Sequence, residues 1–152
     1  MIDVMEIDHL LDYGCGHNLS LKKNLEPTRS FRYQCYDPGV PEYADDPIPA
    51  ELVVCIDVLE HIEPSCIENV LDHLESLTEK VLFATIHTGP AAKKLPDGRN
   101  AHLIQRPVAW WLPKLMDRFQ LQGFHARNAQ GFEVVLIAND YDSRFGTISG
   151  IS

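Results

Sequence analysis

The sequence lacks the features that mark several large classes of protein. No apolar run approaches the roughly 20 residues that a membrane-spanning helix needs, and the first six residues carry two acids and no base, unlike a signal or transit peptide. We therefore expect a cytoplasmic protein without a membrane partner. The four cysteines have no CxxC spacing, which argues against a zinc finger or a disulfide framework.

Positive charge is also scarce, because 13 lysines and arginines stand against 22 aspartates and glutamates and give a formal net charge of −9. Broad nucleic-acid binding depends on neutralising phosphates, so we do not expect it here. A small nucleotide remains compatible with this charge. Lys93, Lys94 and Arg99 form a basic cluster between two ordered segments, and its plain interpretation is a solvated loop.

What is present is typical of one globular domain, with 152 residues of which 45% are hydrophobic and 23% charged, enough for a substantial core. We expect a single domain over residues 1–139 and a polar tail over 140–152. Apolar periodicity and the positions of glycine and proline predict alternating strands and helices. The predicted strands cover residues 9–12, 31–36, 51–56, 81–86, 121–127 and 132–138, and the predicted helices cover 19–25, 64–79 and a segment around 108–119.

Strands separated by helices, with two final strands joined by the short turn 128–131, predict an α/β fold. We expect an open, Rossmann-like, mostly parallel sheet with helices on both faces and an antiparallel C-terminal hairpin. Pro113 means that the last helix either begins near it or kinks. Ligand sites in such sheets lie at the carboxyl ends of the strands. Here these ends are residues 12–18, 37–39, 57–61 and 87–102, the last within a loop long enough to favour a functional role.

The most informative segment is Cys55–Ile62, where an apolar strand ends in Asp57 and the adjacent pair Glu60-His61 follows. A strand that finishes in polar groups at its carboxyl end is typical of ligand sites in open α/β sheets. In isolation the segment is equally consistent with a buried strand that precedes a capped helix. Its meaning therefore depends on the other strand ends.

Two further strand ends favour a ligand site over a purely structural role for this segment. Asp12-x-Gly14-x-Gly16 follows the first strand and supplies glycines for a tight turn close to a ligand. Asp37 closes the next strand, 21 positions after Gly16, where a carboxylate can accept both hydroxyls of a ribose. Leu19 stands where the dinucleotide fingerprint needs a third glycine, which disfavours nicotinamide and flavin. Each motif alone has a structural explanation, but together they favour an adenosine-containing ligand.

The runs Leu10–Gly16, Cys35–Pro38 and Asp57–Ile62 resemble the successive motifs of class I S-adenosylmethionine-dependent methyltransferases. The resemblance covers about residues 9–138. It implies a seven-stranded sheet with a terminal hairpin, with S-adenosylmethionine as cofactor and S-adenosylhomocysteine as product. It also implies cofactor contacts from the glycine loop, the ribose acid and the strand end beside the sulfonium and adenine: Asp12, Gly14, Cys15, Gly16, Asp37, Pro38, Asp57, Val58 and Leu59.

The sequence departs from this family in two places. Only residues 38–50 lie between the ribose acid and the next strand, so the family's third strand is predicted to be missing. Its adenine contact is then open, with Asp45 and Asp46 as candidates. The N-terminal helices that usually cover the substrate are missing as well. We therefore expect the loop 87–102, or another subunit of a homo-oligomer, to cover the site.

Methyl transfer is an in-line displacement that needs alignment, and an acceptor that starts as a hydroxyl or ammonium must lose a proton. Histidine suits this role near neutral pH. His61, His87 and His102 all lie at predicted strand ends or in the long loop. We assign the catalytic base to His61 or His102. The alternatives are a helix-capping role for His61 and a packing role for His102.

A metal is not favoured, although one pattern allows it. Asp57, Glu60 and His61, together with His102, resemble the metal ligands of small-RNA terminal 2′-O-methyltransferases, and ubiquinone-pathway O-methyltransferases are similar at the first three positions. In those enzymes a divalent ion such as Mg²⁺ holds two hydroxyl oxygens of the acceptor. The same Glu-His pair is widespread in methyltransferases that use no metal.

The sequence therefore predicts methyl transfer to an oxygen or nitrogen atom of a small-molecule or nucleotide-like acceptor. It lacks the Pro-Pro motif of amino-methylating DNA enzymes and the Pro-Cys nucleophile of cytosine-C5 enzymes. Gly89–His102 resembles a loop of uncharacterised, often phage-borne, methyltransferases. The alternatives are a non-catalytic cofactor-binding subunit of a larger complex and a nicotinamide-binding domain.

Two tryptophans, Trp110 and Trp111, could stack on a base or another ring of the ligand. Trp110 is the better candidate, because Trp111 shares the apolar stripe of its helix.

Overall fold

The computed structural model of the chain describes residues 1–127 and 130–141. The polar tail expected over 140–152 lies outside the described residues except for its first two positions. Half of the expected turn 128–131 lies outside them as well. Within the described ranges, no helix is both long enough and apolar enough to cross a membrane.

Six strands form one sheet in the order β2-β1-β3-β4-β6-β5. The strands β1, β2, β3 and β4 run parallel to one another, whereas β6 is antiparallel to both β4 and β5. The strands are β1 (His9–Tyr13), β2 (Arg32–Tyr36), β3 (Ala50–Ile56), β4 (Thr78–His87), β5 (Phe119–Ala126) and β6 (Gly131–Ala138). This arrangement confirms the predicted mostly parallel sheet with an antiparallel C-terminal hairpin.

No strand lies between β2 and β3, as predicted. The connection contains only the 3-10 turn η1 (Pro41–Tyr43), and its prolines at 41, 47 and 49 prevent a regular helix or a central strand. β2 is therefore the edge of the sheet. The face beside β2 lacks the cover that a further strand and its helix would provide.

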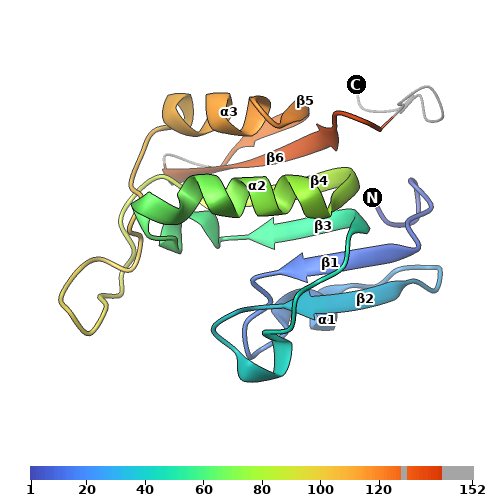
Figure 1. Cartoon of the computed structure of the whole chain (residues 1–152), viewed down its shortest axis with the longest axis horizontal. Helices are drawn as coiled ribbons and strands as arrows, with labels where there is room; N and C mark the ends of the chain where they lie inside the picture. The colour runs from blue at the N-terminus through green and yellow to red at the C-terminus, as the bar shows by residue number, and fades with distance from the viewer. Residues whose placement is uncertain (128–129, 142–152) are drawn as a thin grey trace.

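The helices divide between the two faces of the sheet. Helices α2 (Ile67–Leu77) and α3 (Val108–Met116) pack on one face and form the larger core with buried residues of β1, β3, β4 and β6. Among the described residues, the other face is covered mainly by the N-terminal segment and the five-residue helix α1 (Ser20–Asn24), with Leu25 and Tyr141 packed beside them. In Figure 1, α2 crosses in front of the sheet while α1 lies behind β2.

The predicted helix over 64–79 was wrong at both ends. Residues 64–66 form the 3-10 turn η3 before α2, and β4 already begins at Thr78. The hydroxyl of Thr78 donates to the carbonyl of Leu74 at 2.7 Å and so satisfies a carbonyl at the helix end. Lys80, the residue after the predicted helix, lies in β4 and forms an ion pair with Glu51 at 2.6 Å.

The last helix also differs from its prediction. It begins at Val108, so it does not start at Pro113, which lies inside it. Phe119 begins β5 rather than ending the helix. Met116, the last residue of α3, is 53% exposed. Trp111 is fully buried, which confirms its place in the core.

Candidate functional site

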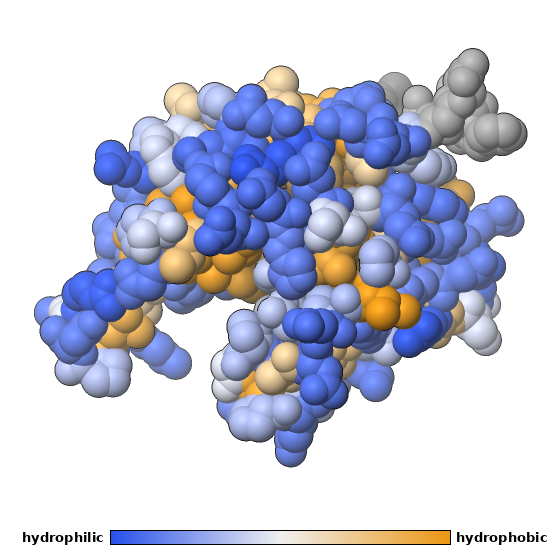
Figure 2. All heavy atoms as spheres, viewed as in Figure 1, coloured by the Kyte–Doolittle hydropathy of each residue, from blue (hydrophilic) through white to orange (hydrophobic). Residues whose placement is uncertain are grey.

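The carboxyl ends of β1, β2 and β3 open onto a cavity of about 530 Å³, which we call the front cavity. In Figure 2 the molecule is hollowed between two lobes, which are the loop after β4 and the segment after β2. The front cavity is lined by Tyr13, Gly14, Tyr36, Asp37, Pro38, Asp57, Val58, His61, Ile62, Cys66, Asn69, Val70 and His73.

The glycine loop after β1 is shaped for a close approach. Gly14 has a φ of +80°, a left-handed conformation that favours glycine. A Cβ atom there would lie 2.4 Å from Cγ2 of Val58, so only glycine fits against the segment after β3. The amides of Gly14 and Cys15 both donate to the carbonyl of Tyr36, at 2.7 and 3.2 Å, and this ties the loop to the end of β2.

The carboxylate of Asp37 is held at the mouth of this loop. Its Oδ2 accepts a hydrogen bond from the amide of Gly16 at 2.9 Å, and its Oδ1 accepts one from the amide of Gly39 at 2.9 Å. Each oxygen retains a lone pair for a further donor. Pro38 follows on the exposed rim. The spacing between Gly16 and Asp37 seen in the sequence thus corresponds to a direct contact.

Asp12 and Cys15 lie behind the loop rather than in the front cavity. Asp12 is 4% exposed and accepts a hydrogen bond from the hydroxyl of Tyr33. Burial is the main cause that raises the pKa of its carboxyl. Burial also raises the pKa of the Cys15 thiol to about 12, so this thiol is protonated at neutral pH. Both residues line a smaller hollow of about 410 Å³ that shares Gly14 with the front cavity.

Asp57 follows β3 in a strained conformation, with a φ of +53° that is uncommon outside glycine. Its amide donates to the carbonyl of Thr85 at 3.1 Å, and the hydroxyl of Thr85 donates to its Oδ1 at 2.6 Å. Arg127 and His87 also face this oxygen, at 3.5 and 3.9 Å. Val58 lines the front cavity, whereas Leu59 is fully buried in the core.

Glu60 is a fully buried carboxyl group beside the site. Its Oε1 accepts a hydrogen bond from the amide of His87 at 3.0 Å, while its Oε2 is buried without a partner among the described residues. Burial is the largest cause that raises the pKa of Glu60. A buried carboxyl oxygen without a partner costs stability and therefore calls for a function.

Two histidines meet beside Glu60. Nδ1 of His61 lies 2.8 Å from the carbonyl of Ala101, and Nδ1 of His102 lies 2.7 Å from the carbonyl of Gly89. A carbonyl can only accept, so each ring carries its proton on Nδ1 and has a lone pair on Nε2. The two ring centroids are 4.8 Å apart, edge to face. His61 is exposed, whereas His102 is 8% exposed.

Asn100 fixes the long loop that carries His102. Its side-chain amide donates to the carbonyl of Ala91 at 2.8 Å, and its oxygen accepts from the amides of Ala91 and His102, both at 2.9 Å. Arg99 joins the same loop to the start of the α2 region through two hydrogen bonds to Glu63, at 2.8 and 3.0 Å. The loop thus holds His102 beside His61.

The donor atoms at this end of the sheet fall into two groups that share Glu60. One group is Glu60, His61 and His102, and the other is Asp57, Glu60 and His87, with all ligand atoms of each group within 4.8 Å of one another. The structure thus separates Asp57 from the two histidines with which the sequence pattern grouped it. Glu60 has an oxygen, Oε2, without a partner among the described residues, and each group offers one ligand atom per residue, so both donor sets suit a divalent ion.

The front cavity also contains residues that the sequence did not single out. Tyr13, Tyr36 and His73 form an aromatic cluster along its wall, with ring centroids 5.0 to 5.7 Å apart. Asn69 lies on the same wall. By contrast, Trp110 packs against Trp111 and Lys114 and is not among the lining residues. The periodicity of α2 could have indicated this wall, because a mixed stripe lies beside its apolar stripe.

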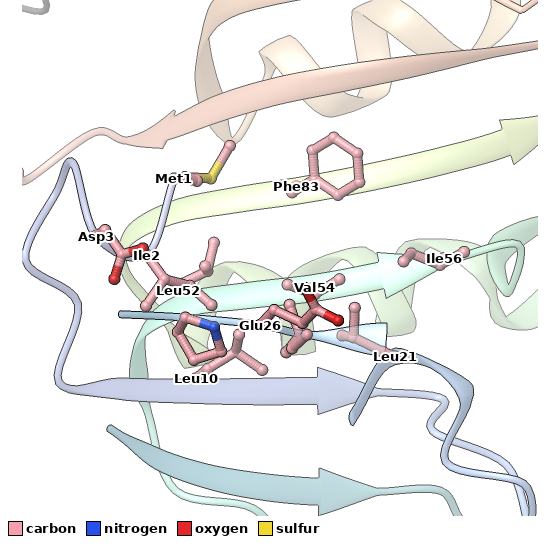
Figure 3. Close-up of a pocket in the computed structure, with 12 residues that line it drawn as sticks. Met1, Ile2, Asp3, Leu10, Leu21, Glu26, Leu52, Val54, Ile56 and Phe83 are labelled. Atoms are coloured by element: carbon pink, nitrogen blue, oxygen red, sulfur yellow. The ribbon is translucent and has the colours of Figure 1, made fainter. Parts of the chain in front are cut away.

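A second cavity of about 340 Å³, which we call the back cavity, lies on the other face of the sheet. Figure 3 shows apolar side chains from β1, β3 and β4 on its floor, with the N-terminal residues and Leu21 at its border. Its lining is Met1, Ile2, Asp3, Leu10, Leu21, Leu25, Glu26, Pro27, Leu52, Val54, Ile56 and Phe83. No predicted site residue lies there.

No protein-family model and no curated protein matches the sequence, but many solved structures match the fold. An O-methyltransferase family protein from Burkholderia thailandensis is similar over 91% of this chain, with a TM-score of 0.67 and 13% identity, and the chain spans 53% of that protein. The N-methyltransferase NodS from Bradyrhizobium japonicum WM9, solved with S-adenosylhomocysteine, has a TM-score of 0.63 and 11% identity over 88% of this chain and 79% of its own.

A third structure is magnesium protoporphyrin IX methyltransferase (ChlM) from Synechocystis PCC 6803 with bound S-adenosylmethionine. It has a TM-score of 0.55 and 18% identity over 85% of this chain and 69% of its own. Identities at this level establish the fold alone. The chain therefore has the class I methyltransferase fold.

Proposed function

We propose that this protein transfers a methyl group from S-adenosylmethionine to an oxygen or nitrogen atom of a small acceptor. One observation carries the proposal: a single cavity is lined by the glycine loop at Gly14, the carboxylate of Asp37 and the imidazole of His61. S-adenosylmethionine needs a glycine loop that its methionine half can approach closely, and its ribose needs a carboxylate that accepts hydrogen bonds. The molecule that receives the methyl group needs a base to take its proton. The class I fold supports the same function.

In this proposal the ribose hydroxyls donate to Asp37, whose carboxylate is already oriented by two backbone amides. Pro38 bounds the adenosine half of the cofactor. The methionine half follows the loop at Cys15 and Gly16, with Val58 beside the sulfonium. Asp57 lines the cavity itself, with its carboxylate held by the hydroxyl of Thr85. Asp12 and Leu59 support these contacts from behind, through a hydrogen bond from Tyr33 and through burial.

His61 is the proposed general base. Its Nδ1–H is donated to the carbonyl of Ala101, so Nε2 has a lone pair that can take a proton from the acceptor. His102 is the alternative base, and in the buried position that it occupies it also holds the ring of His61 edge-on. The acceptor is proposed to be a small molecule or nucleotide-like, because the cavity of about 530 Å³ must hold both reactants.

The proposal is tested by titrating the protein with S-adenosylmethionine, S-adenosylhomocysteine and NAD in a calorimeter, followed by mass spectrometry of acceptor pools incubated with the labelled methyl donor. We expect binding of both sulfur compounds, no binding of NAD, and label in an acceptor. Preference for NAD would contradict the proposal. Tight binding without transfer to any acceptor would favour a cofactor-binding subunit instead.

The role of the histidines is tested with the same label. His61→Ala should cut turnover by roughly a hundredfold or more, the usual contribution of a positioned base, and leave the affinity for S-adenosylhomocysteine within about twofold. His102→Ala is the parallel variant. The matched control is His125→Ala, which removes an exposed histidine of β5 that faces Glu133 and does not line the front cavity. Full activity in both His61→Ala and His102→Ala would refute the assignment.

A second candidate, favoured by the unpartnered Oε2 of Glu60, is methyl transfer that a divalent ion assists. Glu60, His61 and His102 would hold the ion, with both rings already oriented by backbone carbonyls. When bound, the ion would supply charge stabilisation to acceptor oxygens. Two imidazoles with one carboxylate suit a transition-metal ion such as Mn²⁺ better than Mg²⁺.

This second candidate is tested by titrating Mn²⁺ into the cofactor-free protein, with electron paramagnetic resonance as the readout. Glu60→Gln keeps the shape of the side chain and should weaken binding by roughly tenfold or more, since it removes the anionic ligand. Glu75→Gln, on an exposed position of α2, is the control. Equal Mn²⁺ affinity in Glu60→Gln and the wild type, or activity unchanged by a chelator, would exclude the metal from this role.

A further inference from the structure

We propose that the purine of the bound cofactor is recognised by the end of β2 and by helix α2, through Tyr36 and Asn69, in the space that the missing strand leaves open. This inference rests on the proposed function, because it assumes that the front cavity holds an adenosine. It assigns the adenine contact that the sequence left open and replaces Asp45 and Asp46 as its candidates.

Helix α2 presents a distinct face to the front cavity. Cys66, Asn69, Val70 and His73 all line it, and their spacing of three or four residues places them on one side of a helix. The neighbouring face, which includes Leu71 and Leu74, is buried in the core. The resemblance to class I methyltransferases implies a further strand beside β2, which the described part of this chain lacks. Here β2 is the edge strand, so the face of α2 remains open to a ligand.

The aromatic residues of this wall brace the ring of Tyr36 at steep angles, 55° to Tyr13 and 84° to His73. The ring of Tyr36 lies 5.0 Å from that of Tyr13 and 5.7 Å from that of His73. The hydroxyl of Tyr13 and Nδ1 of His73 are 3.0 Å apart, which fixes the two supporting rings. Tyr36 itself is only half-buried, so part of its surface is available for stacking.

Tyr36 is adjacent in sequence to Asp37, the proposed ribose acceptor, so a nucleoside held by Asp37 extends its base along the same wall. Asn69 is exposed, lines the same cavity and stands one helical turn before His73, whose ring contacts Tyr36. Its side-chain amide offers one donor and one acceptor group, a combination that pairs with the amino group and N7 of adenine. With an oxo group in place of the amino group this edge presents two acceptors, so the side-chain oxygen of Asn69 loses its donor.

The test compares two ligands by calorimetry: S-adenosylhomocysteine and S-inosylhomocysteine, in which the purine amino group is replaced by an oxo group. The wild type should prefer the adenosine compound by about tenfold, a modest value for bidentate recognition by asparagine. Asn69→Leu should reduce this preference to about twofold or less. Tyr36→Ala should weaken both ligands by about tenfold, as the loss of one stacked base does.

Glu75→Ala is the control, because Glu75 is exposed on the same helix and does not line the cavity. Tyr36→Leu retains bulk without a ring and replaces Tyr36→Ala if that variant does not fold. Unchanged affinities in the Tyr36 variants, or an unchanged preference in Asn69→Leu, would overturn this inference while the wild type still binds S-adenosylhomocysteine. Failure of the wild type to bind that compound would instead contradict the proposed function.

Discussion

The front and back cavities lie on opposite faces of one sheet and differ in what lines them. The back cavity has ten apolar side chains and two carboxylates, Asp3 and Glu26, and the carboxylate of Asp3 already accepts a hydrogen bond from the amide of Thr28. The front cavity combines aromatic rings with two carboxylates, two histidines, the amide of Asn69 and a glycine loop. Ligand sites generally pair an apolar wall with a few convergent polar groups.

The difference has a structural origin. The back cavity lies over Leu10, Leu52 and Val54, which point away from α2 and α3, where a five-residue helix is too short to cover them. The back cavity is therefore a region where the apolar residues of the sheet are incompletely covered. The front cavity instead lies where three parallel strands end together, and its polar groups come from the residues that follow each strand. A hollow therefore indicates a site only when polar groups converge on it.

The largest expected effect comes from Gly14→Ala in the front cavity. The new Cβ atom meets Val58 at a backbone angle that favours glycine, so we expect the affinity for S-adenosylhomocysteine to fall by up to roughly a hundredfold. Calorimetry measures it. Gly98→Ala is the matched control, since Gly98 also has a positive φ, of +88°, but open space around it. Equal affinity for S-adenosylhomocysteine in Gly14→Ala and Gly98→Ala would contradict the assignment of the front cavity as the cofactor site.

A smaller effect is expected at the back cavity. Phe83→Ala removes a half-buried ring that packs against the second core, which should lower the free energy of unfolding by about 1–3 kcal/mol in a urea titration. The affinity for S-adenosylhomocysteine should stay within about twofold of the wild type. If Phe83→Ala folds stably but no longer binds S-adenosylhomocysteine, the back cavity contributes to the cofactor site, which contradicts its separation from the front cavity.

The smallest effect concerns pH. Burial raises the pKa of Asp12 above its usual value of 3.8, so the folded state holds this proton more tightly than the unfolded state. The protein therefore loses stability as the pH rises from the unfolded-state pKa of this group to its folded-state pKa. Asp12→Asn carries no such charge and can still accept from Tyr33. The difference in melting temperature, variant minus wild type, should increase from about pH 4 upward and then level off. A difference that is constant or that decreases with pH would contradict this account.

Much of the fold could be predicted because its strands are buried and sharply ended. The bounds of β1, β2 and β3 lie within one residue of their predictions, since glycine, proline or aspartate follows each apolar run. The boundary between α2 and β4 could not be predicted. Residues 77–82 fit either element locally, and the hydrogen bond from Thr78 to Leu74 that ends the helix depends on the final packing.

The site could be predicted only in the parts that are local in sequence. Gly14 and Asp37 each stand directly after a strand, so the parallel sheet was enough to bring them together. The contact of Arg127 with Asp57 joins distant segments and depends on the antiparallel hairpin. Asn69 was missed for a related reason: the periodicity of α2 marks a mixed stripe beside the apolar one, but only the packing of α2 beside the sheet decides which residues of that stripe meet the cavity.

The central claim is that the front cavity is the cofactor site, and a crystal structure with S-adenosylhomocysteine tests it most directly. We predict that the ligand lies in the front cavity, with its ribose hydroxyls on Asp37 and its sulfur near Val58. Density for the ligand in the back cavity, or in the front cavity with no contact to Asp37, would contradict the account.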